Sequence, residues 1–344
     1  HSKNNRVRND SMSDSVKLKD IADALQVSIV TVSNALSGKR GVSEEVRTKI
    51  IEKAEQMGYS RAKYKKDSES GLKIGVIVPE KYLHVGISFY WAMYQMVAYR
   101  ASKKQSFTVF EMLPTEEEKK GELPKILYEN SIDGLIIIGW VEKSYVQKLV
   151  ALSNVPVVLL DFYVEGIACD AVMSNNYIGM YKMTRYLIER GHKKIAFIGT
   201  IEANENIMDR YFGYRKAMEE ASLPLEKKWL IKDRDAETGD MEVELPDELP
   251  TAFVCNCDLA AGLLYDKLQK AGYSIPKDIS IVGYDNYLFA HPFAEQITTY
   301  NVDMEQMAKA AVKILIKKIK GSDRHQGIKY IDSSIVERNS VRRI

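Results

Sequence analysis

Two short helices at the start of the chain are predicted by the spacing of its apolar residues. These residues recur at steps of three and four: Leu18, Ile21, Ala22 and Leu25 in the first helix, then Val32, Ala35 and Leu36 in the second. Ser28 can cap the second helix because its hydroxyl can accept a hydrogen bond from a free N–H group at the helix start. A third helix is predicted after Ser43, which can cap it in the same way. Three helices with a tight turn between the first two predict a helix-turn-helix domain.

The second helix leaves small, uncharged and partly hydroxylated side chains on its outer face. With Ser28, which precedes the helix, these are Ile29, Val30, Thr31, Ser33 and Asn34. Such a face suits the DNA major groove, where Asn can pair with adenine, aliphatic carbons can contact thymine methyl groups and hydroxyl groups can bind phosphate. The alternative is an ordinary three-helix bundle, whose second helix more usually carries Lys and Glu outside.

From Leu72 onward the pattern changes to short runs rich in β-branched residues. The predicted strands are "LKIGVIVP", "FTVFEML", "DGLIIIG", "VPVVLLD", "DAVMSN", "KKIAFIG", "TAFVCN" and "ISIVGYD". Predicted helices separate them, for instance at residues 89–105, 179–190, 211–221 and 257–271. Alternating strands and helices predict parallel sheets covered on both faces, and the two series of strands predict two such units in tandem. The expected fold is therefore α/β, preceded by a small all-α domain.

Charge is distributed unevenly along a chain of ordinary globular composition. The 344 residues are 45% hydrophobic and 28% charged, and the formal net charge is only +2. Residues 39–66, however, hold nine Lys and Arg residues against four Glu residues. A basic amino-terminal region favours a phosphate-binding surface, although a solvated helix face is the simpler alternative.

The sequence carries no signature of an enzyme, a metal site or a membrane span. We find no G-x-G-x-x-G or G-x-x-x-x-G-K-[ST] motif, no G-x-S-x-G or H-E-x-x-H motif, and no cluster of His and Cys ligands. We therefore expect neither catalysis nor a cofactor nor a metal. The three Cys residues lack the spacing of a disulfide framework, and no apolar run approaches the length of a membrane span. A cytoplasmic protein without membrane contact is expected.

Residues 18–59 resemble the amino-terminal domain of the LacI/GalR family of transcription regulators. The resemblance is carried by "LKDIADALQVSIVTVSNALSGKRGVSEEVRTKIIEKAEQMGY", with V-S-x-x-T-V-S-x-x-L-x-G followed by V-S, R and G-Y in register. The rest resembles the effector-binding core of the same family, which is similar to periplasmic sugar-binding proteins, in "LIERGHKKIAFIG", "DRYFGYRKAMEEASLP", "ISIVGYDN", "ITTYNVDMEQMAKAAVKIL" and "SSIVERNS". It covers nearly the whole chain and implies two subdomains joined by three crossovers, with a small ligand in the cleft between them.

Pattern and resemblance together predict the domain boundaries. We expect a disordered tail or tag remnant at residues 1–15, a helix-turn-helix domain at 16–59, a linker at 60–71 and an effector-binding and dimerisation core at 72–344. The core should hold an N-subdomain of residues 72–161 and 291–322 and a C-subdomain of residues 162–290 and 323–344. The linker departs from the family: Ser68 stands where an apolar Leu wedge is usual, so a charged, flexible connection is the simpler interpretation.

The resemblance also implies site residues. It assigns base reading to Ile29, Val30 and Asn34 and phosphate contacts to Ser28, Thr31 and Ser33. It places effector contacts at strand ends and at a helix start: Asp161, Asn256, Asp285 and Arg210, the last of which would open the helix beginning "RYFGY". Phe89, Tyr90 and Trp140 are suited to form an apolar platform for a sugar ring. The alternatives are helix capping for the carboxylates and core packing for Trp140, while Arg234 would suit an acidic or phosphorylated effector.

These observations predict a homodimeric transcription repressor. Its partners would be a double-stranded operator DNA and a small effector, a sugar or a sugar phosphate, bound between the subdomains. The helix "SFYWAMYQMVAYRA" and the helix around residues 263–268 are expected to form the dimer surface, because the first carries more Met and aromatic residues than one core face needs. The atypical linker motivates the alternative of a cytoplasmic sugar-binding sensor with weakened DNA binding.

Overall fold

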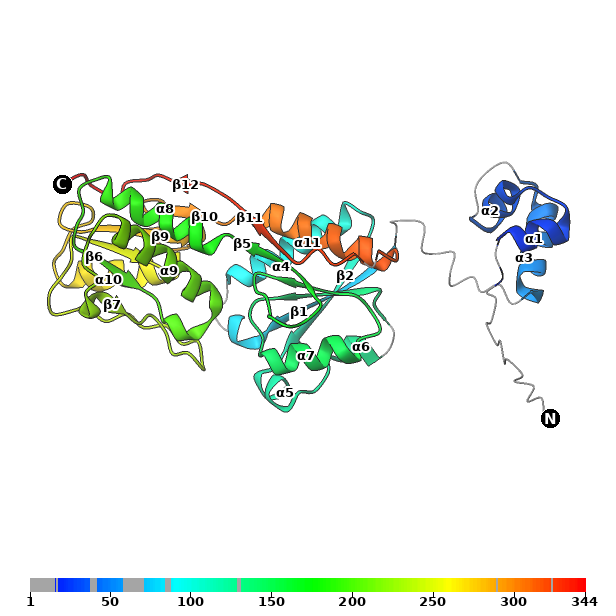
Figure 1. Ribbon diagram of the computed structural model, residues 1–344, viewed down its shortest axis with the longest axis horizontal. Coiled ribbons are helices and arrows are strands. Elements are labelled where there is room, and N and C mark those ends of the chain that lie inside the picture. Colours follow the sequence, from blue (N-terminus) through cyan, green and yellow to red (C-terminus); the bar gives the residue numbers. More distant parts are fainter. Residues whose placement is uncertain are drawn as a thin grey trace, which may run out of the picture. The chain divides into compact units, whose positions relative to one another are not determined.

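A computed structural model describes residue 16 and residues 18–37, 42–57, 71–83, 88–128, 131–288, 290–322 and 324–344. The chain divides into two compact units, with the division between residues 68 and 69 (Figure 1). The predicted tail at 1–15 and residues 60–70 of the predicted linker lie outside the described residues.

Three helices form the described part of the first unit. They are α1 (Leu18–Leu25), α2 (Ile29–Ser37) and α3 (Glu44–Gln56). Their buried side chains are those that the apolar spacing predicts: Ile21, Ala22, Val32, Ala35, Ile50 and Ala54. Both predicted caps are confirmed, because the Thr31 N–H group donates to Ser28 Oγ at 3.0 Å and the Val46 N–H group donates to Ser43 Oγ at 3.4 Å.

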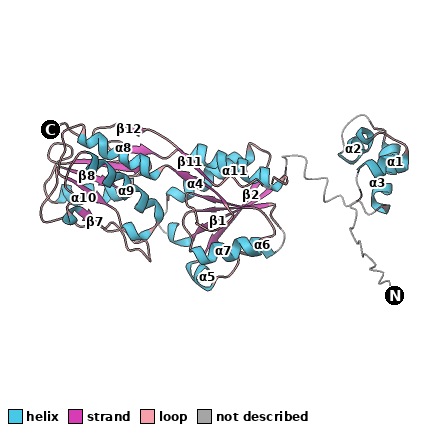
Figure 2. Cartoon of the chain, in the orientation of Figure 1, coloured by secondary structure: helices cyan, strands magenta, loops and turns pink. Residues whose placement is uncertain are grey.

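The second unit contains two sheets, and we call each sheet with its helices a lobe (Figures 1 and 2). The first sheet runs β11-β5-β4-β3-β1-β2 and is parallel throughout. Its strands are β1 (Lys73–Pro79), β2 (Phe107–Leu113), β3 (Gly134–Ile138), β4 (Val157–Leu160), β5 (Asp170–Ser174) and β11 (Ile328–Ile331). The helices of this first lobe are η2 (Glu80–Tyr82), α4 (Phe89–Ser102), α5 (Thr115–Lys120), α6 (Lys125–Tyr128), α7 (Lys143–Leu152) and α11 (Met304–Ile319).

The second sheet runs β12-β10-β9-β8-β6-β7, and only the pairing of β12 with β10 is antiparallel. Its strands are β6 (Ile195–Ile198), β7 (Leu230–Ile231), β8 (Ala252–Cys255), β9 (Ser280–Asp285), β10 (Thr298–Asn301) and β12 (Ile335–Val336). The helices of this second lobe are α8 (Asn176–Ile188), η3 (Ile201–Ala203), α9 (Glu205–Glu220), η4 (Lys227–Trp229) and α10 (Asp258–Lys270). The predicted α/β class with tandem sheets is confirmed.

The chain passes between the lobes three times, after β5, after β10 and after β11. These crossovers correct the predicted subdomain boundaries for three strands. β5 and β11 lie in the first sheet although we predicted them in the C-subdomain, and β10 lies in the second sheet although we predicted it in the N-subdomain. The reason is physical: a short buried strand fits either sheet by composition, and only its pairing decides, here β5 with β4 and β10 with β9.

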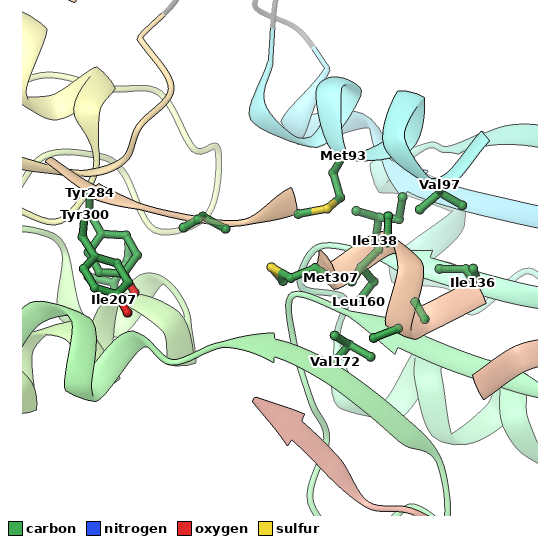
Figure 3. Close-up of a cluster of buried hydrophobic side chains, with 14 of the residues drawn as sticks. Met93, Val97, Ile136, Ile138, Leu160, Val172, Ile207, Tyr284, Tyr300 and Met307 are labelled. Carbon is green, nitrogen blue, oxygen red and sulfur yellow. The ribbon is translucent and has the colours of Figure 1, made fainter. Parts of the chain in front are cut away.

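Buried apolar side chains fill the space between each sheet and its helices. One cluster runs through both lobes, and in the first it includes Met93 and Val97 of α4 and Met307 of α11 (Figure 3). In the second lobe Tyr284 and Tyr300 stack with ring centroids 5.1 Å apart (Figure 3). Among the helices of the described ranges, none has both the length and the apolar character needed to span a bilayer.

Candidate functional site

The outer face of α2 carries exposed aliphatic side chains beside hydroxyl groups. Ile29 is 47% exposed and Val30 is 66% exposed, although both side chains are apolar. Ser28 Oγ and Thr31 Oγ1 lie 2.8 Å apart, so the two hydroxyl groups are hydrogen-bonded to one another at the start of the helix. Ser33 and Asn34 are half-buried. The structure thus places all six predicted DNA-contacting residues on or directly before one helix, with two large apolar side chains left in water.

The turn before α2 contains backbone in the left-handed region. Gln26 has φ 53°, and the N–H group of the following Val27 donates to the Ala22 carbonyl at 3.1 Å. Gly adopts such a φ without steric cost, whereas a residue with a side chain does not. Gln26 therefore carries a modest backbone strain in the turn that leads into α2.

Polar side chains meet at the carboxyl ends of the strands in both lobes. Asp161 follows β4 in the first lobe, while Asn256 follows β8 and Asp285 ends β9 in the second. Asp161 and Asp285 both have positive φ, 66° and 105°. Parallel sheets bind ligands in the crevice outside these strand ends, so the residues converge where a ligand is expected. We call this region the cleft.

Arg210 links these residues. Its Nε donates to Asn176 Oδ1 at 2.8 Å, its Nη1 donates to the Asn256 carbonyl at 2.7 Å, and its Nη2 lies 3.4 Å from Asp285 Oδ1. The guanidinium also lies over the Tyr284 ring, 3.9 Å from the centroid. Because four groups hold it and it is only 5% exposed, Arg210 is a rigid, fully engaged cation.

The predicted position of Arg210 at a helix start is wrong. The helix α9 begins at Glu205, where the Asn204 side chain caps it by accepting from the Ile207 N–H group at 3.0 Å. Arg210 therefore lies inside α9, and the preceding turn brings Asn206 to the cleft as well. Asn204 as a cap was missed because "ANEN" carries two Asn residues and no apolar spacing that locates the first turn.

Asp161 retains a free acceptor. Its Oδ2 accepts from the Tyr90 hydroxyl at 3.1 Å and from Asn206 Nδ2 at 3.2 Å, whereas its Oδ1 is buried without a hydrogen-bond partner. Burial raises the pKa of Asp161 to about 6, although Arg210 and the two hydrogen bonds oppose the change. A buried acceptor of this kind favours a ligand that donates a hydrogen bond to it.

The pKa of Asp285 is raised further than that of Asp161. Burial raises the pKa of Asp285 to about 8, with Arg210 opposing the rise and the carboxylates of Asp258 and Asp161 adding to it. Asp161 of the first lobe is thus one of the charges that raise the pKa of Asp285 in the second lobe. Ligand hydroxyl groups placed between them would relieve the desolvation of both.

Asn256 and Arg234 are tied to Asp233. Asn256 Nδ2 donates to Asp233 Oδ2 at 2.7 Å, and Arg234 Nη2 donates to the same oxygen at 2.6 Å. Arg234 Nη2 also lies 3.3 Å from Cys257 Sγ. Arg234 thus reaches the cleft, but its charge is neutralised by its own neighbour Asp233, which is fully buried.

The three predicted aromatic residues take different places. Tyr90 packs against Tyr82, with centroids 4.5 Å apart, and Phe89 contacts Tyr90 edge-on at 5.3 Å. Phe89 also meets Tyr287 of the second lobe at 6.0 Å. Trp140 is half-buried, and the Lys81 ammonium covers its ring at 4.4 Å. Phe89 and Tyr90 therefore line the cleft, while one face of Trp140 is occupied by a lysine.

Sequence reasoning missed Tyr82, Asn176, Asn206 and Asp233 as members of this network. Asn176 and Asn206 hydrogen-bond to one another at 3.0 Å and so connect α8 with α9. The signal for Asn176 was available, because it directly follows a predicted strand, whereas nothing in the sequence around Asn206 singles it out. Within the described ranges, His, Cys, Asp and Glu side chains form no group that could hold a metal ion.

Comparisons with known proteins show which family and which fold the chain resembles. A model of the bacterial regulatory proteins of the lacI family matches residues 17–62, and a model of the periplasmic binding protein-like domain matches residues 184–341. The HTH-type transcriptional repressor PurR of Vibrio atlanticus (strain LGP32) is 28% identical over 335 residues, which cover 94% of this chain and 98% of PurR.

Two solved structures share the fold. The complex of the transcriptional regulator CelR with cellobiose has a TM-score of 0.66 at 20% identity and covers 94% of this chain and 99% of its own. The lac repressor dimer bound to operator and the anti-inducer ONPF also has a TM-score of 0.66 at 20% identity, covering 96% of this chain and 100% of its own.

Proposed function

Because the chain belongs to the LacI family of bacterial regulatory proteins, we propose that it is a repressor that binds operator DNA through α2 and whose affinity for that DNA depends on a small molecule held in the cleft. The observation that carries the proposal is the exposed pair Ile29 and Val30 on a capped second helix. Two large apolar side chains left in water on an uncharged helix face are explained by contact with thymine methyl groups in a major groove. The proposed role of the whole chain is therefore to regulate transcription and not to catalyse a reaction.

The effector is a neutral polyol, of which a sugar is the best example. Asp161 Oδ1 and the carboxyl group of Asp285 can accept from ligand hydroxyl groups, and Phe89 and Tyr90 can pack against the C–H face of a ring. A phosphorylated effector is less well matched, because Arg210 is bound by four groups and Arg234 is paired with Asp233. The cellobiose complex of CelR supports this choice.

Effector binding can act on the DNA-binding unit through the arrangement of the lobes. Asp161 belongs to the first lobe and Asp285 to the second, so a ligand that bonds to both favours one relative position of the lobes over another. The polypeptide crosses between the lobes three times. We therefore expect such a motion to be a rotation of one lobe against the other about these crossovers.

We further propose that the protein acts as a homodimer in the cytoplasm, where a bacterial operator is found. Exposed apolar side chains mark α4 and the edge strand β2: Trp91 at 37%, Tyr99 at 46%, Phe107 at 51% and Met112 at 40%. Aromatic and Met residues of this kind are enriched at protein interfaces. The dimeric lac repressor on its operator supports a two-fold complex with two half-sites.

The test begins with selection of binding sequences from random duplex DNA by the full-length protein. We expect an inverted repeat, with an affinity that falls steeply with salt. Thr31→Ala combined with Asn34→Ala should abolish the preference for that sequence, whereas Thr48→Ala, an exposed threonine on α3, should not. The sensor alternative predicts no preferred sequence even at low salt, and that result would overturn the proposal.

A thermal-shift screen of sugars and sugar phosphates tests the effector. We expect an unphosphorylated sugar to raise the unfolding temperature, and a hit should then change operator affinity. A phosphorylated sugar that binds more tightly than its parent sugar would contradict the assignment of a neutral effector.

A further inference from the structure

A second cavity lies outside the cleft, over a crossover between the lobes. It has a volume of about 710 Å³, and its walls come from both lobes. The part that concerns us, which we call the crossover groove, is formed by Tyr163, Asn175, Tyr177, Asp209, Phe212 and Tyr330. Tyr163 and Tyr330 belong to the first lobe, Tyr177 lies on α8, and Asp209 and Phe212 lie on α9. A volume of this size accommodates a small organic molecule.

The walls of the crossover groove are aromatic and open to water. Tyr177 is 38% exposed, Phe212 is 43% exposed and Tyr330 is 49% exposed. Large aromatic side chains gathered in a concave surface are unusual on a protein that needs them only for packing. The faces of these rings carry negative potential, which attracts a cation.

The charges at one end of the cavity cancel. Arg215 lies 2.6 Å from Glu219, and Lys216 lies 2.5 Å from Glu220, each pair one turn apart on α9. These four residues therefore contribute little net field to the rest of the groove.

Asp209 belongs to neither of these ion pairs. Within the part of the chain that the structure describes, its carboxylate makes no hydrogen bond and no ion pair, and it is half-buried. Glu205 lies one turn earlier on α9, and its Oε2 is buried without a partner. Burial raises the pKa of Asp209, and the negative charge of Glu205 raises it further, while the positive charge of Arg210 opposes the rise. Like charges one turn apart on a helix repel one another, and the nearby Arg210 is already engaged by Asn176, Asn256 and Asp285.

We propose that the crossover groove binds a small organic cation, a primary amine or a quaternary ammonium with an apolar body. The ammonium group would lie against Asp209 and toward Glu205, where it neutralises the two carboxylates. The apolar body would lie on the rings of Tyr177, Phe212 and Tyr330. The site is distinct from the cleft, because Asn206 and Arg210, which alternate with these acidic residues on α9, are bonded into the cleft network.

Calorimetry with two probes, each matched to a neutral analogue, tests the proposal. We expect the full-length protein to bind benzylamine and choline, and to bind benzyl alcohol and 3,3-dimethylbutan-1-ol at least about tenfold more weakly. Asp209→Asn should weaken binding of both cations about tenfold or more, and Phe212→Ala should weaken benzylamine most. Asp247→Asn, at an exposed position in the second lobe, is the matched control and should leave binding unchanged.

Hydrogen exchange locates the bound cation. Benzylamine should slow exchange of the amides of α8 and α9 that border the crossover groove, and Arg210→Lys should leave its affinity unchanged because Arg210 belongs to the cleft. The proposal is overturned if neither cation binds saturably in the millimolar range, if the neutral analogues bind equally well, or if Asp209→Asn has no effect while Arg210→Lys does.

Discussion

Arg47 on α3 donates a hydrogen bond to the backbone carbonyl of Ala35 near the carboxyl end of α2, with an N–O distance of 2.8 Å. A second, longer bond of 3.4 Å runs to the Asn34 carbonyl. The last carbonyl groups of a helix have no partner inside the helix and carry partial negative charge, so a guanidinium is well placed there. Arg47 thus holds the end of α2 on which Asn34 lies, without belonging to the surface that we assign to DNA.

Replacing Arg47 should therefore loosen α2 and weaken DNA binding indirectly. We expect Arg47→Ala to cost about 1.5–3 kcal/mol of stability in the first unit, the range for a hydrogen bond that involves a charged group. Hydrogen exchange in the intact protein should show faster exchange across residues 29–37, and operator affinity should fall for all sequences alike. Lys49→Ala removes an exposed cation that pairs with Glu45, and it should change neither. Unchanged exchange in α2 would refute the role of Arg47.

The strain at Gln26 leads to a prediction of the opposite sign. Since φ is 53° there, Gln26→Gly should stabilise the first unit by about 0.5–1 kcal/mol, the cost of a left-handed residue less the entropy that Gly loses on folding. The matched change Gln105→Gly, at φ 54° in the second unit, should stabilise that unit alone. Hydrogen exchange measured at increasing temperature, separately for the amides of α1–α2 and of β1–β2, distinguishes the effects of the two substitutions. A destabilised first unit in Gln26→Gly would show that its side chain contributes more than its backbone costs.

The sequence predicted the first unit well because its structure is decided locally. The spacing of Ile21, Val32 and Ile50 specifies three amphipathic helices, and Ser28 and Ser43 specify where two of them begin. None of these features depends on residues far away along the chain, so a single sequence contains them in full.

The second unit was harder to predict because its assembly depends on long-range pairing. The strand Asp170–Ser174 is buried and could have joined either sheet, and its partners Val157–Leu160 and Ile328–Ile331 are known only once the fold is known. In the same way Asp161, Asn256 and Asp285 could be named from strand ends, whereas Asn206 lies in the first turn of α9 and Asp233 follows the two-residue strand β7, and neither position has a distinct pattern in the sequence.

The Arg210 network predicts how a conservative change affects the cleft. Lys keeps the positive charge but cannot bond Asn176, Asn256 and Asp285 together in the fixed geometry of a guanidinium. We expect Arg210→Lys to fold and to bind the effector sugar about 10–100-fold more weakly, a loss of roughly 1.4–2.8 kcal/mol in calorimetry. Arg215→Lys, on the exposed side of the same helix, should bind normally. Equal affinity in both variants would mean that Arg210 does not organise the cleft.

The proposed dimer surface can be tested at Tyr99 on α4. The ring is 46% exposed and lies next to the cations of Arg100 and Lys103, so a carboxylate in its place remains compatible with the monomer fold. Tyr99→Glu should weaken self-association by about tenfold or more in sedimentation velocity, roughly 1.4 kcal/mol. Tyr128→Glu, at a ring 68% exposed on α6, is the control and should leave the dimer intact. A dimer unaffected by Tyr99→Glu would place the interface elsewhere.

Asp258 should make the stability of the second unit depend on pH in a direction opposite to that of most carboxyl groups. Burial raises the pKa of Asp258 to about 7, against 3.8 for the unperturbed group, although the Thr299 hydroxyl and the Tyr287 N–H group each donate to it at 2.8 Å. Between these two values the folded protein holds a proton on Asp258 that the unfolded chain has released. The free energy of unfolding contributed by this group therefore falls as the pH rises through that window.

The contribution of Asp258 is isolated by comparison with Asp258→Asn, which cannot titrate. Other groups titrate in both directions, since the pKa values of Asp170 and Asp233 are lowered and those of Asp161 and Asp285 are raised, so only the difference between the two proteins is informative. From about pH 4.5 to 8 the wild-type protein should lose stability relative to Asp258→Asn by at least about 1.4 kcal/mol, the equivalent of one pKa unit, in urea unfolding. Asp247→Asn should show a flat difference, because Asp247 is exposed. A wild-type protein that gains stability relative to Asp258→Asn as the pH rises would show that Asp258 is charged in the folded state throughout this range.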